Sequence, residues 1–222
     1  MLGLSGIPLS GDPVNLLRIE AFENSLRRLG TDYIDVYFCH LWWDKQEETE
    51  AFMDAFGQLK RDGKVRAVGV STENFDYIQH FNRDGGLEAV QLDYSIMNRS
   101  VEREVLPYLH ENGIGAVVRG PLRMGILTGK FHAGTEFSEG DIRRNWPKES
   151  WFADNLAKVE ALKPLANGER TLSQVALRFV LNHPAISVEI PGAKTAVQAI
   201  QNVSAYIRPL LSDDDMSVIN KI

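Results

Sequence analysis

Short apolar runs alternate with longer amphipathic segments along most of the chain. The apolar runs read as buried strands over 34–38, 66–70, 89–92, 115–118 and 186–190. Before, between and after them, apolar residues recur with helical spacing over about 13–29, 47–61, 75–83, 101–111, 151–165, 172–181, 196–206 and 213–221. Strands that alternate with helices predict a parallel sheet covered by helices.

Capping signals mark the starts of several of these helices. Asp12 and Pro13 supply an N-cap and a first-turn proline for the first helix. Thr171 and Gln174 form a capping-box pattern, and Ser212 is placed to cap the last helix. One face of the first helix carries the apolar side chains that we expect to face the core: Leu16, Leu17, Ala21, Phe22, Leu26 and Leu29.

Two architectures fit a parallel sheet of this kind, an open doubly wound sheet and a closed barrel. The open sheet usually has a Gly-rich turn after its first strand, and this chain lacks one. Small polar turns instead follow strand ends late in the chain, at 68–71 and 190–192, as in barrels whose last loops hold phosphate. We therefore predict a TIM-type (β/α)8 barrel. A full barrel takes about 250 residues, so we expect this chain to hold about five of the eight units in a single domain, 1–222.

Composition and charge narrow the classes of partner and compartment. The chain has 222 residues and a formal net charge of −6, which disfavours binding to nucleic acid. Its single cysteine, Cys39, cannot form an internal disulfide, as expected in a reducing compartment. No apolar stretch approaches the roughly 18 residues of a membrane span, and the first residues lack the basic start of a signal peptide. We predict a cytoplasmic protein without a membrane partner.

Five segments in order resemble the aldo-keto reductase family: SLRRLGTDYIDVYFCH at 25–40, GKVRAVGVST at 63–72, AVQLDYS at 89–95, RGPLRMGILTGK at 119–130 and IPGAKTAVQAIQN at 190–202. The resemblance extends from about Val14 to Asn202. It implies a (β/α)8 barrel that binds NADPH and reduces a small aldehyde or ketone. The five strands would then be the fourth to the eighth, and 1–222 the C-terminal five-eighths of the barrel.

The resemblance carries over one catalytic residue. The family uses an Asp, a Tyr acid, a Lys and a His, and His40 at the end of IDVYFCH is the counterpart of the His. A neutral imidazole there could donate a hydrogen bond to a carbonyl oxygen. The alternative is a strand-end histidine that satisfies a backbone group. The Asp, Tyr and Lys belong to earlier strands, so we expect an N-terminally truncated reductase that is inactive or impaired.

Three residues resemble the family's site for the nicotinamide carboxamide. Ser71 and Thr72 stand where the family usually has Ser-Asn, and Thr72 replaces the amide with a hydroxyl. Gln91 matches a carboxamide-binding Gln, and an amide inside AVQL is costly to bury without a partner. The alternatives are a helix cap for the Ser-Thr pair and an ordinary buried amide for Gln91.

A turn after the fourth strand resembles the pyrophosphate site. Arg119 takes the place of an aromatic ring that stacks on the nicotinamide in many members, and a guanidinium plane can also stack. Gly120, Leu122 and Met124 follow in a turn whose backbone N–H groups could approach the pyrophosphate. The alternative is a Pro/Gly turn with a solvated arginine.

The segment after the last strand resembles the site for the adenosine part. Gly192, Ala193 and Lys194 lead into a helix, and Lys194 adds a charge suited to the 2′-phosphate of NADP. Three polar residues, namely Gln198, Gln201 and Asn202, share one side of that helix. The resemblance places Asn202 at the adenine. Gln198 stands where Arg is common, so the preference for NADP, and the affinity for it, are expected to be weak.

The patterns leave three functional hypotheses open: an impaired carbonyl reductase, a nucleotide-binding pseudoenzyme, and a structural or assembly module without turnover. The strands at 34–38 and 186–190 would be open sheet edges, which predicts a homo-oligomer. His80, His110, His132 and His183 show no metal-ligand spacing, so we predict no metal site. The resemblance places three tryptophans on the substrate side: Trp42, Trp43 and Trp146.

Overall fold

The computed structural model of the chain describes residues 14–40 and 46–222 and divides into two compact units. The first unit runs to Leu92 and also includes Glu104–Ala116, whereas the second comprises Asp93–Arg103 and Val117–Ile222. The assignment of 1–222 to one domain stays a prediction. The expected cap at Asp12 lies outside the described residues.

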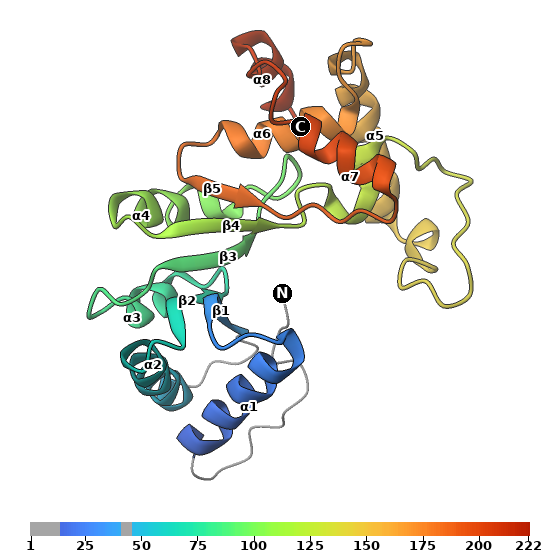
Figure 1. Ribbon diagram of the computed structural model, residues 1–222. Helices are drawn as coiled ribbons and strands as arrows, with labels where there is room; N and C mark the ends of the chain where they lie inside the picture. Colours follow the sequence, from blue (N-terminus) through green and yellow to red (C-terminus); the bar gives the residue numbers. More distant parts are fainter. Residues whose placement is uncertain (1–13, 41–45) are drawn as a thin grey trace. The chain divides into compact units, whose positions relative to one another are not determined.

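Strands and helices follow each other along the chain as the apolar pattern predicts (Figure 1). The order begins with α1 (Val14–Leu29), β1 (Ile34–His40), α2 (Gln46–Arg61), β2 (Val65–Ser71), α3 (Phe75–Phe81), β3 (Ala89–Asp93), α4 (Val105–Glu111) and β4 (Gly115–Arg119). It continues with α5 (Ser150–Leu162), α6 (Leu172–Asn182), β5 (Ile186–Glu189), α7 (Ala196–Ser204) and α8 (Asp213–Ile219). Within the described ranges, four short 3-10 helices lie between them: η1 (Ser100–Glu102), η2 (Arg123–Thr128), η3 (Trp146–Lys148) and η4 (Lys163–Leu165).

The five strands form one sheet in the order β1-β2-β3-β4-β5. β1 pairs with β2, and β2 with β3, in parallel, so the predicted parallel α/β sheet is confirmed. The register places Phe38 of β1, Gly69 of β2 and Ala89 of β3 side by side, as one row across the three strands. A second row lies two residues further along each strand and begins with His40 of β1. Side chains two residues apart leave the same face of a strand, so these rows lie on one face of the sheet.

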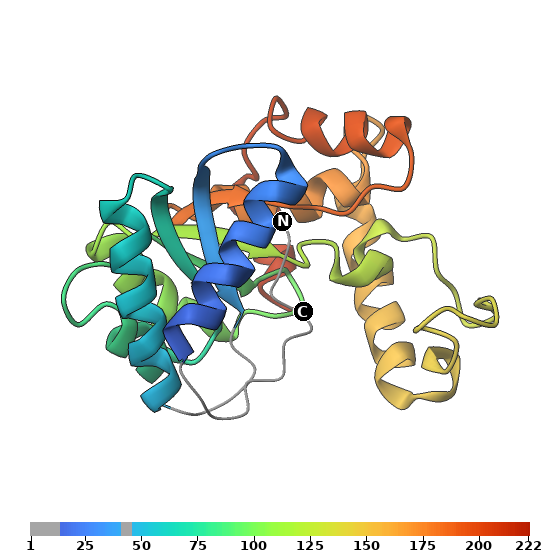
Figure 2. The same ribbon diagram turned by 60° about the horizontal axis from the view of Figure 1, so that its bottom comes forward.

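Helices cover the opposite face in the first unit. α1 and α2 lie side by side over β1 and β2 (Figure 2). Aromatic rings join these elements, with 5.0 Å between the ring centroids of Phe22 and Tyr37 and 5.9 Å between those of Tyr37 and Phe56. Leu29 was expected to face the core but is 54% exposed. Residues 27–30 are all exposed, because the last turn of α1 extends beyond the core.

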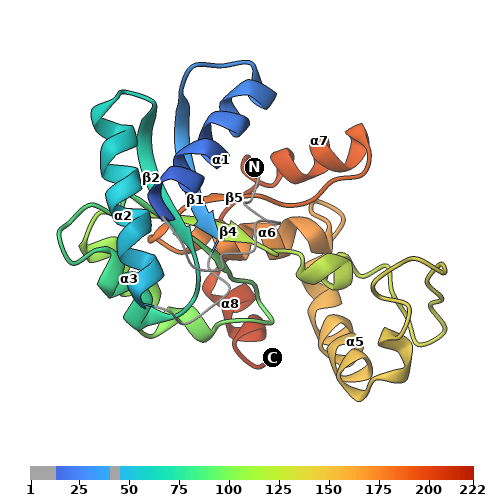
Figure 3. The same cartoon turned by 90° about the horizontal axis from the view of Figure 1, so that it is seen from below.

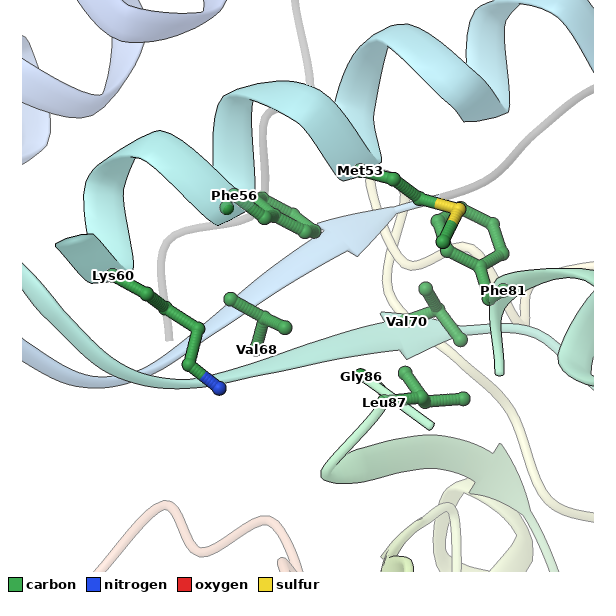
Figure 4. Close-up of a pocket in the computed structure, with 9 residues that line it drawn as sticks. Met53, Phe56, Lys60, Val68, Val70, Phe81, Gly86 and Leu87 are labelled. Carbon is green, nitrogen blue, oxygen red and sulfur yellow. The ribbon is translucent and has the colours of Figure 1, made fainter. Parts of the chain in front are cut away.

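A cavity of about 140 Å³ lies among α2, β2 and α3 of the first unit (Figure 4). Its lining is Met53, Phe56, Gly57, Lys60, Val68, Val70, Phe81, Gly86 and Leu87. Lys60 forms an ion pair with Glu88, whose second oxygen accepts a hydrogen bond from the Val68 backbone N–H at 2.8 Å. Val68 and Val70 therefore mark the helix-covered face of β2, and Gly69 and Ser71 point to the other face.

α6 packs against several elements of the second unit. It contacts β5, η2 and α7 (Figure 3). The predicted capping box at its start is confirmed, because Thr171 Oγ1 accepts from Gln174 N at 3.2 Å and Gln174 Oε1 accepts from Thr171 N at 2.9 Å. The predicted cap of α8 is confirmed as well, since Ser212 Oγ accepts from Asp215 N at 3.1 Å.

An aromatic cluster fixes the long connection between η2 and α5 in the second unit. It comprises Phe131, Phe137, Trp146, Trp151 and Phe152. The ring centroids of Trp146 and Trp151 lie 5.1 Å apart with an interplanar angle of 71°. The guanidinium of Arg143 lies 5.0 Å from the Phe137 centroid and adds a cation–π contact. Elsewhere in the fold, no helix of the described ranges combines the length and apolarity needed to cross a membrane.

Candidate functional site

A polar row crosses three neighbouring strands at their carboxyl ends in the first unit. The register aligns His40 of β1 with Ser71 of β2, and Ser71 with Gln91 of β3. Ser71 and Gln91 are both buried, and Ser71 Oγ donates to Gln91 Oε1 at 3.3 Å. The row lies on the face away from α2 and α3, where parallel barrels carry their inward-facing side chains.

The structure decides against a capping role for the Ser-Thr pair. The N-cap of α3 is Asn74, whose Oδ1 accepts from Tyr77 N at 3.1 Å. Thr72 Oγ1 accepts from Asn74 N at 3.1 Å and thus supports the loop before that cap. Ser71 is turned to Gln91 instead, so the buried hydroxyl and amide form a polar pair on the inner face of the strands.

A tightly packed apolar row lies next to this polar row on the same face of the sheet. Phe38, Gly69 and Ala89 are aligned two residues before it on the same three strands. A methyl group on Gly69 would lie 2.5 Å from Phe38 Cε1 and 2.8 Å from the Ala89 carbonyl oxygen. The Phe38 ring thus occupies the space that a side chain at position 69 would need.

Asp93 organises the end of β4 in the second unit and was not identified from the sequence. Its Oδ2 lies 3.2 Å from Arg119 Nη1 and 3.7 Å from Arg123 Nη1. Gly120 has φ of +69°, and a Cβ there would lie 3.3 Å from both Asp93 carboxylate oxygens. Arg119 is therefore paired rather than only solvated. A polar residue two positions after Gln91 on the same strand face is the signal that could have indicated Asp93.

The turn after β4 has an unusual backbone. Arg123 and Met124 have φ of 47° and 52°, the left-handed region that side chains other than glycine rarely occupy. The Leu122 carbonyl accepts from Gly125 N at 2.9 Å, and the Met124 carbonyl accepts from Arg143 Nη1 at 3.3 Å. Contacts from β3 and from the aromatic connection thus hold the strained turn from two sides.

Three cations and one carboxylate gather near this turn. Arg143 Nη2 lies 2.6 Å from Asp141 Oδ2, and this hydrogen-bonded contact holds the pKa of Asp141 well below its usual range. Burial lowers the pKa of Lys130, and the charges of Arg143 and Lys194 act in the same direction. The sequence had indicated only Lys194 of these cations. The lysine of LTGK and the Asp-x-Arg spacing were the available signals for the others.

The loop before α7 is folded onto its own side chains. Gln198 Oε1 accepts from Lys194 N at 2.7 Å, and Asn202 Nδ2 donates to the Gly192 carbonyl at 3.4 Å. Thr195 is the N-cap, and its hydroxyl oxygen accepts from Gln198 N at 3.2 Å. A Cβ on Gly192 would meet nothing within 4 Å, so the surface there is open.

The predicted site residues fall into two groups, each within one unit. The first unit holds His40, Ser71, Thr72 and Gln91. The second holds Arg119, Gly120, Leu122, Met124, Gly192, Ala193, Lys194, Gln198, Gln201 and Asn202. Gln201 contributes its carbonyl, which accepts from Ser204 Oγ at 2.8 Å. Trp42 and Trp43 lie outside the described residues, whereas Trp146 belongs to the aromatic cluster. In the described ranges, His, Cys, Asp and Glu side chains form no group of three that could hold a metal ion.

The fold and the row at the carboxyl strand ends define an α/β protein with its candidate site where parallel barrels place theirs. The chain belongs to the aldo/keto reductase family, whose model matches residues 18–222. It is 34% identical over 214 residues to the NADH-specific methylglyoxal reductase of Escherichia coli, covering 91% of this chain and 63% of that protein. It is 31% identical over 208 residues to aldo-keto reductase yakc [NADP(+)] of Schizosaccharomyces pombe, covering 91% of this chain and 61% of that protein.

A solved structure shows the same fold. The glycerol dehydrogenase of Gluconobacter oxydans superposes with a TM-score of 0.83 at 27% identity, over 93% of this chain and 63% of that one. The chain therefore spans less than two thirds of the length of each of these three relatives. The family resemblance inferred from the sequence is confirmed.

Proposed function

We propose that each of these two groups of residues binds a part of the nicotinamide nucleotide in an NADPH-dependent reductase of small aldehydes or ketones, built on strands four to eight of a (β/α)8 barrel. The observation that carries the proposal is the in-register row of His40, Ser71 and Gln91 at the carboxyl ends of three parallel strands. Buried polar side chains without a capping role, placed at this edge, are typical of a ligand site.

The residues present fit a nicotinamide dinucleotide. Ser71 and Gln91 are a buried hydroxyl and amide, which match the donor and acceptor groups of a carboxamide. The strained turn at 122–125 and the cations Lys130, Arg143 and Lys194 suit phosphate groups. The open surface at Gly192 leaves room for a ligand next to the backbone. A bound cofactor of this kind supplies hydride.

His40 is the proposed partner of the substrate. It ends β1 in register with Ser71, so its imidazole belongs to the same edge of the sheet as the carboxamide site. A neutral imidazole N–H donates a hydrogen bond to a carbonyl oxygen, orients that oxygen and stabilises the negative charge that develops on it. The resemblance supplies His40 but no counterpart of the family's Tyr–Lys pair that would donate the proton. General acid catalysis contributes about 10²–10⁴-fold to the rate of such a reaction. We therefore expect these 222 residues to consume NADPH with simple aldehydes at or near background.

NADP is the proposed cofactor, bound weakly. The motivation is Lys194, which lies near Lys130 and Arg143 in the second unit. The names of two relatives point to different cofactors: the reductase of Escherichia coli is called NADH-specific, and yakc of Schizosaccharomyces pombe carries NADP(+) in its name. Gln198 is folded back onto the Lys194 backbone N–H and supplies no charge, which favours a modest preference.

Titration of NADPH and NADH by calorimetry at low salt tests the proposal. We expect NADPH to bind more tightly, and Lys194→Ala to weaken NADPH binding while leaving NADH binding nearly unchanged. Lys163→Ala is a matched control, because Lys163 is an exposed lysine paired with Glu160. Absence of binding of both nucleotides would contradict the proposed function, and equal affinities would remove the role of Lys194.

A second candidate function is an assembly module without turnover, with or without nucleotide. The observation that favours it is the apolar stripe on α7, which has no buried residue although Val197, Ile200 and Val203 share one helix. Such a surface on a soluble protein marks an interaction site. Robust nucleotide binding by a monomer would decide against this candidate.

A further inference from the structure

Asp93 combines two placements that no other described carboxylate shares. It ends β3 two residues after Gln91, so its side chain leaves the same strand face as the amide proposed to hold the carboxamide. It also touches both arginines that flank Gly120 in the turn after β4. The side chain of Asp93 is 16% exposed, whereas those of Arg119 and Arg123 are 48% and 40% exposed.

The packing around Gly120 holds this carboxylate closely. Any side chain at position 120 would meet both Asp93 oxygens at 3.3 Å, in addition to the strain of a φ of +69°. The backbone therefore passes directly beside the carboxylate, between the two arginines that it pairs with. The Asp93 carboxylate thus holds the Arg119 guanidinium in place and offsets its positive charge.

We infer that Asp93 is a positioning residue that holds the Arg119 guanidinium in place and neutralises it, so that the turn after β4 accepts the oxidised nicotinamide ring. This inference rests on the proposed function, in which Arg119 takes the place of the ring-stacking aromatic residue. The oxidised nicotinamide ring carries a positive charge and the reduced ring carries none. An arginine without Asp93 would repel the oxidised form selectively, since charges of the same sign in one site disfavour each other.

The ratio of the dissociation constants of NADP⁺ and NADPH measures this role. Asp93→Asn keeps the size of the side chain and removes its charge, and we expect it to raise the ratio about two- to fivefold, the range of a partly exposed ion pair. Arg119→Gln removes the cation, and we expect it to lower the ratio.

Asp215→Asn is the matched control. Asp215 pairs with Arg170 at 2.5 Å in the second unit and has no proposed contact with nucleotide. It should lower the free energy of unfolding and leave the ratio unchanged. Hydrogen–deuterium exchange measured without nucleotide gives a second readout. In Asp93→Asn, the backbone amides of 119–129 should exchange faster than in the wild type, whereas those of α6 should exchange at the wild-type rate.

The outcomes separate the inference from the proposed function. Wild-type binding with an unchanged ratio in Asp93→Asn, or unchanged exchange at 119–129, overturns the role of Asp93 and leaves the nucleotide site standing. Failure of the wild-type chain to bind either nucleotide overturns both. Where Asp93→Asn does not fold, Arg119→Gln decides, because an unchanged ratio in that variant also contradicts the inference.

Discussion

Gly69 lacks a side chain because its neighbours fill the space where one would be. The Phe38 ring could rotate away from a new methyl group, but the Ala89 carbonyl belongs to the strand ladder and cannot. Position 69 therefore links packing to function, since its row lies directly beneath the polar row of the candidate site.

Gly69→Ala should lower the free energy of unfolding by about 1–3 kcal/mol, the range for overpacking a filled core. Urea denaturation measures the change. Gly86→Ala is the control, because a Cβ there meets nothing within 4 Å, and we expect its effect to stay within about 0.5 kcal/mol. Equal stability of Gly69→Ala and wild type would show that β2 and β3 can separate locally.

Glu189 ends β5 with a buried carboxyl group, and burial raises its pKa to about 8. The pKa is thus higher in the folded chain than the ordinary value of 4.5, so the folded state holds the extra proton between these two pH values. The free energy of unfolding therefore falls as pH rises through this window, and the loss is complete above the folded-state pKa.

Glu189→Gln should remove this part of the pH dependence. Urea midpoints of variant and wild type, measured at intervals between pH 5 and pH 9, should diverge in favour of the variant as pH rises. The difference between the two proteins cancels other titrating groups, such as Asp141, whose depressed pKa acts at lower pH. Parallel curves would mean that the carboxyl group is hydrated in the folded chain.

At the scale of elements, the start of α6 shows one residue serving two helices. Gln174 completes the capping box of α6, and its Nε2 donates to Ser204 Oγ, at the end of α7, at 2.7 Å. Its side chain is buried, whereas both hydrogen bonds are only partly buried because their other partners are more exposed. The cap thus also connects α6 to α7.

Thr171→Ala should destabilise the second unit by about 1 kcal/mol, since it removes the acceptor for the Gln174 backbone N–H. Thermal or urea unfolding followed by circular dichroism measures the loss. Thr171→Ser retains the hydroxyl and should lose much less. Similar losses in both variants would point to the threonine methyl group rather than to the cap.

The sequence predicts these elements well because their causes are local. Strand positions follow from apolar runs, and the capping box of α6 from residues three apart. Contacts across elements are a different case: the pairing of Asp93 with Arg119, 26 positions later, depends on strand order and on the turn at Gly120. The left-handed Arg123 and Met124 were not predictable from residue type, because such residues disfavour that conformation.

At the scale of the whole molecule, exposed apolar surface continues beyond α7. It includes Val197, Ile200, Val203, Tyr206, Ile207 and Leu210. The sheet order also places β1 and β5 at the ends of the sheet, where strand edges invite pairing. Both features favour association, which the sequence predicts through open sheet edges.

We expect a dimer or larger assembly in sedimentation at micromolar concentration. Ile200→Lys should shift the distribution toward monomer, because it places a charge in the apolar stripe. Asn167→Lys adds the same charge at an exposed loop position and should leave the distribution unchanged. A compact wild-type monomer would argue against the assembly module.

The aromatic cluster also has an optical consequence. The indoles of Trp146 and Trp151 lie close together and steeply inclined, a geometry in which their electronic transitions couple. Such coupling produces paired circular-dichroism bands of opposite sign that overlap the peptide signal. Helix content read from the far-ultraviolet spectrum would then be distorted by two side chains. Trp151→Phe should change that spectrum without loss of helix, so the spectrum itself reports whether the connection at 130–149 is folded.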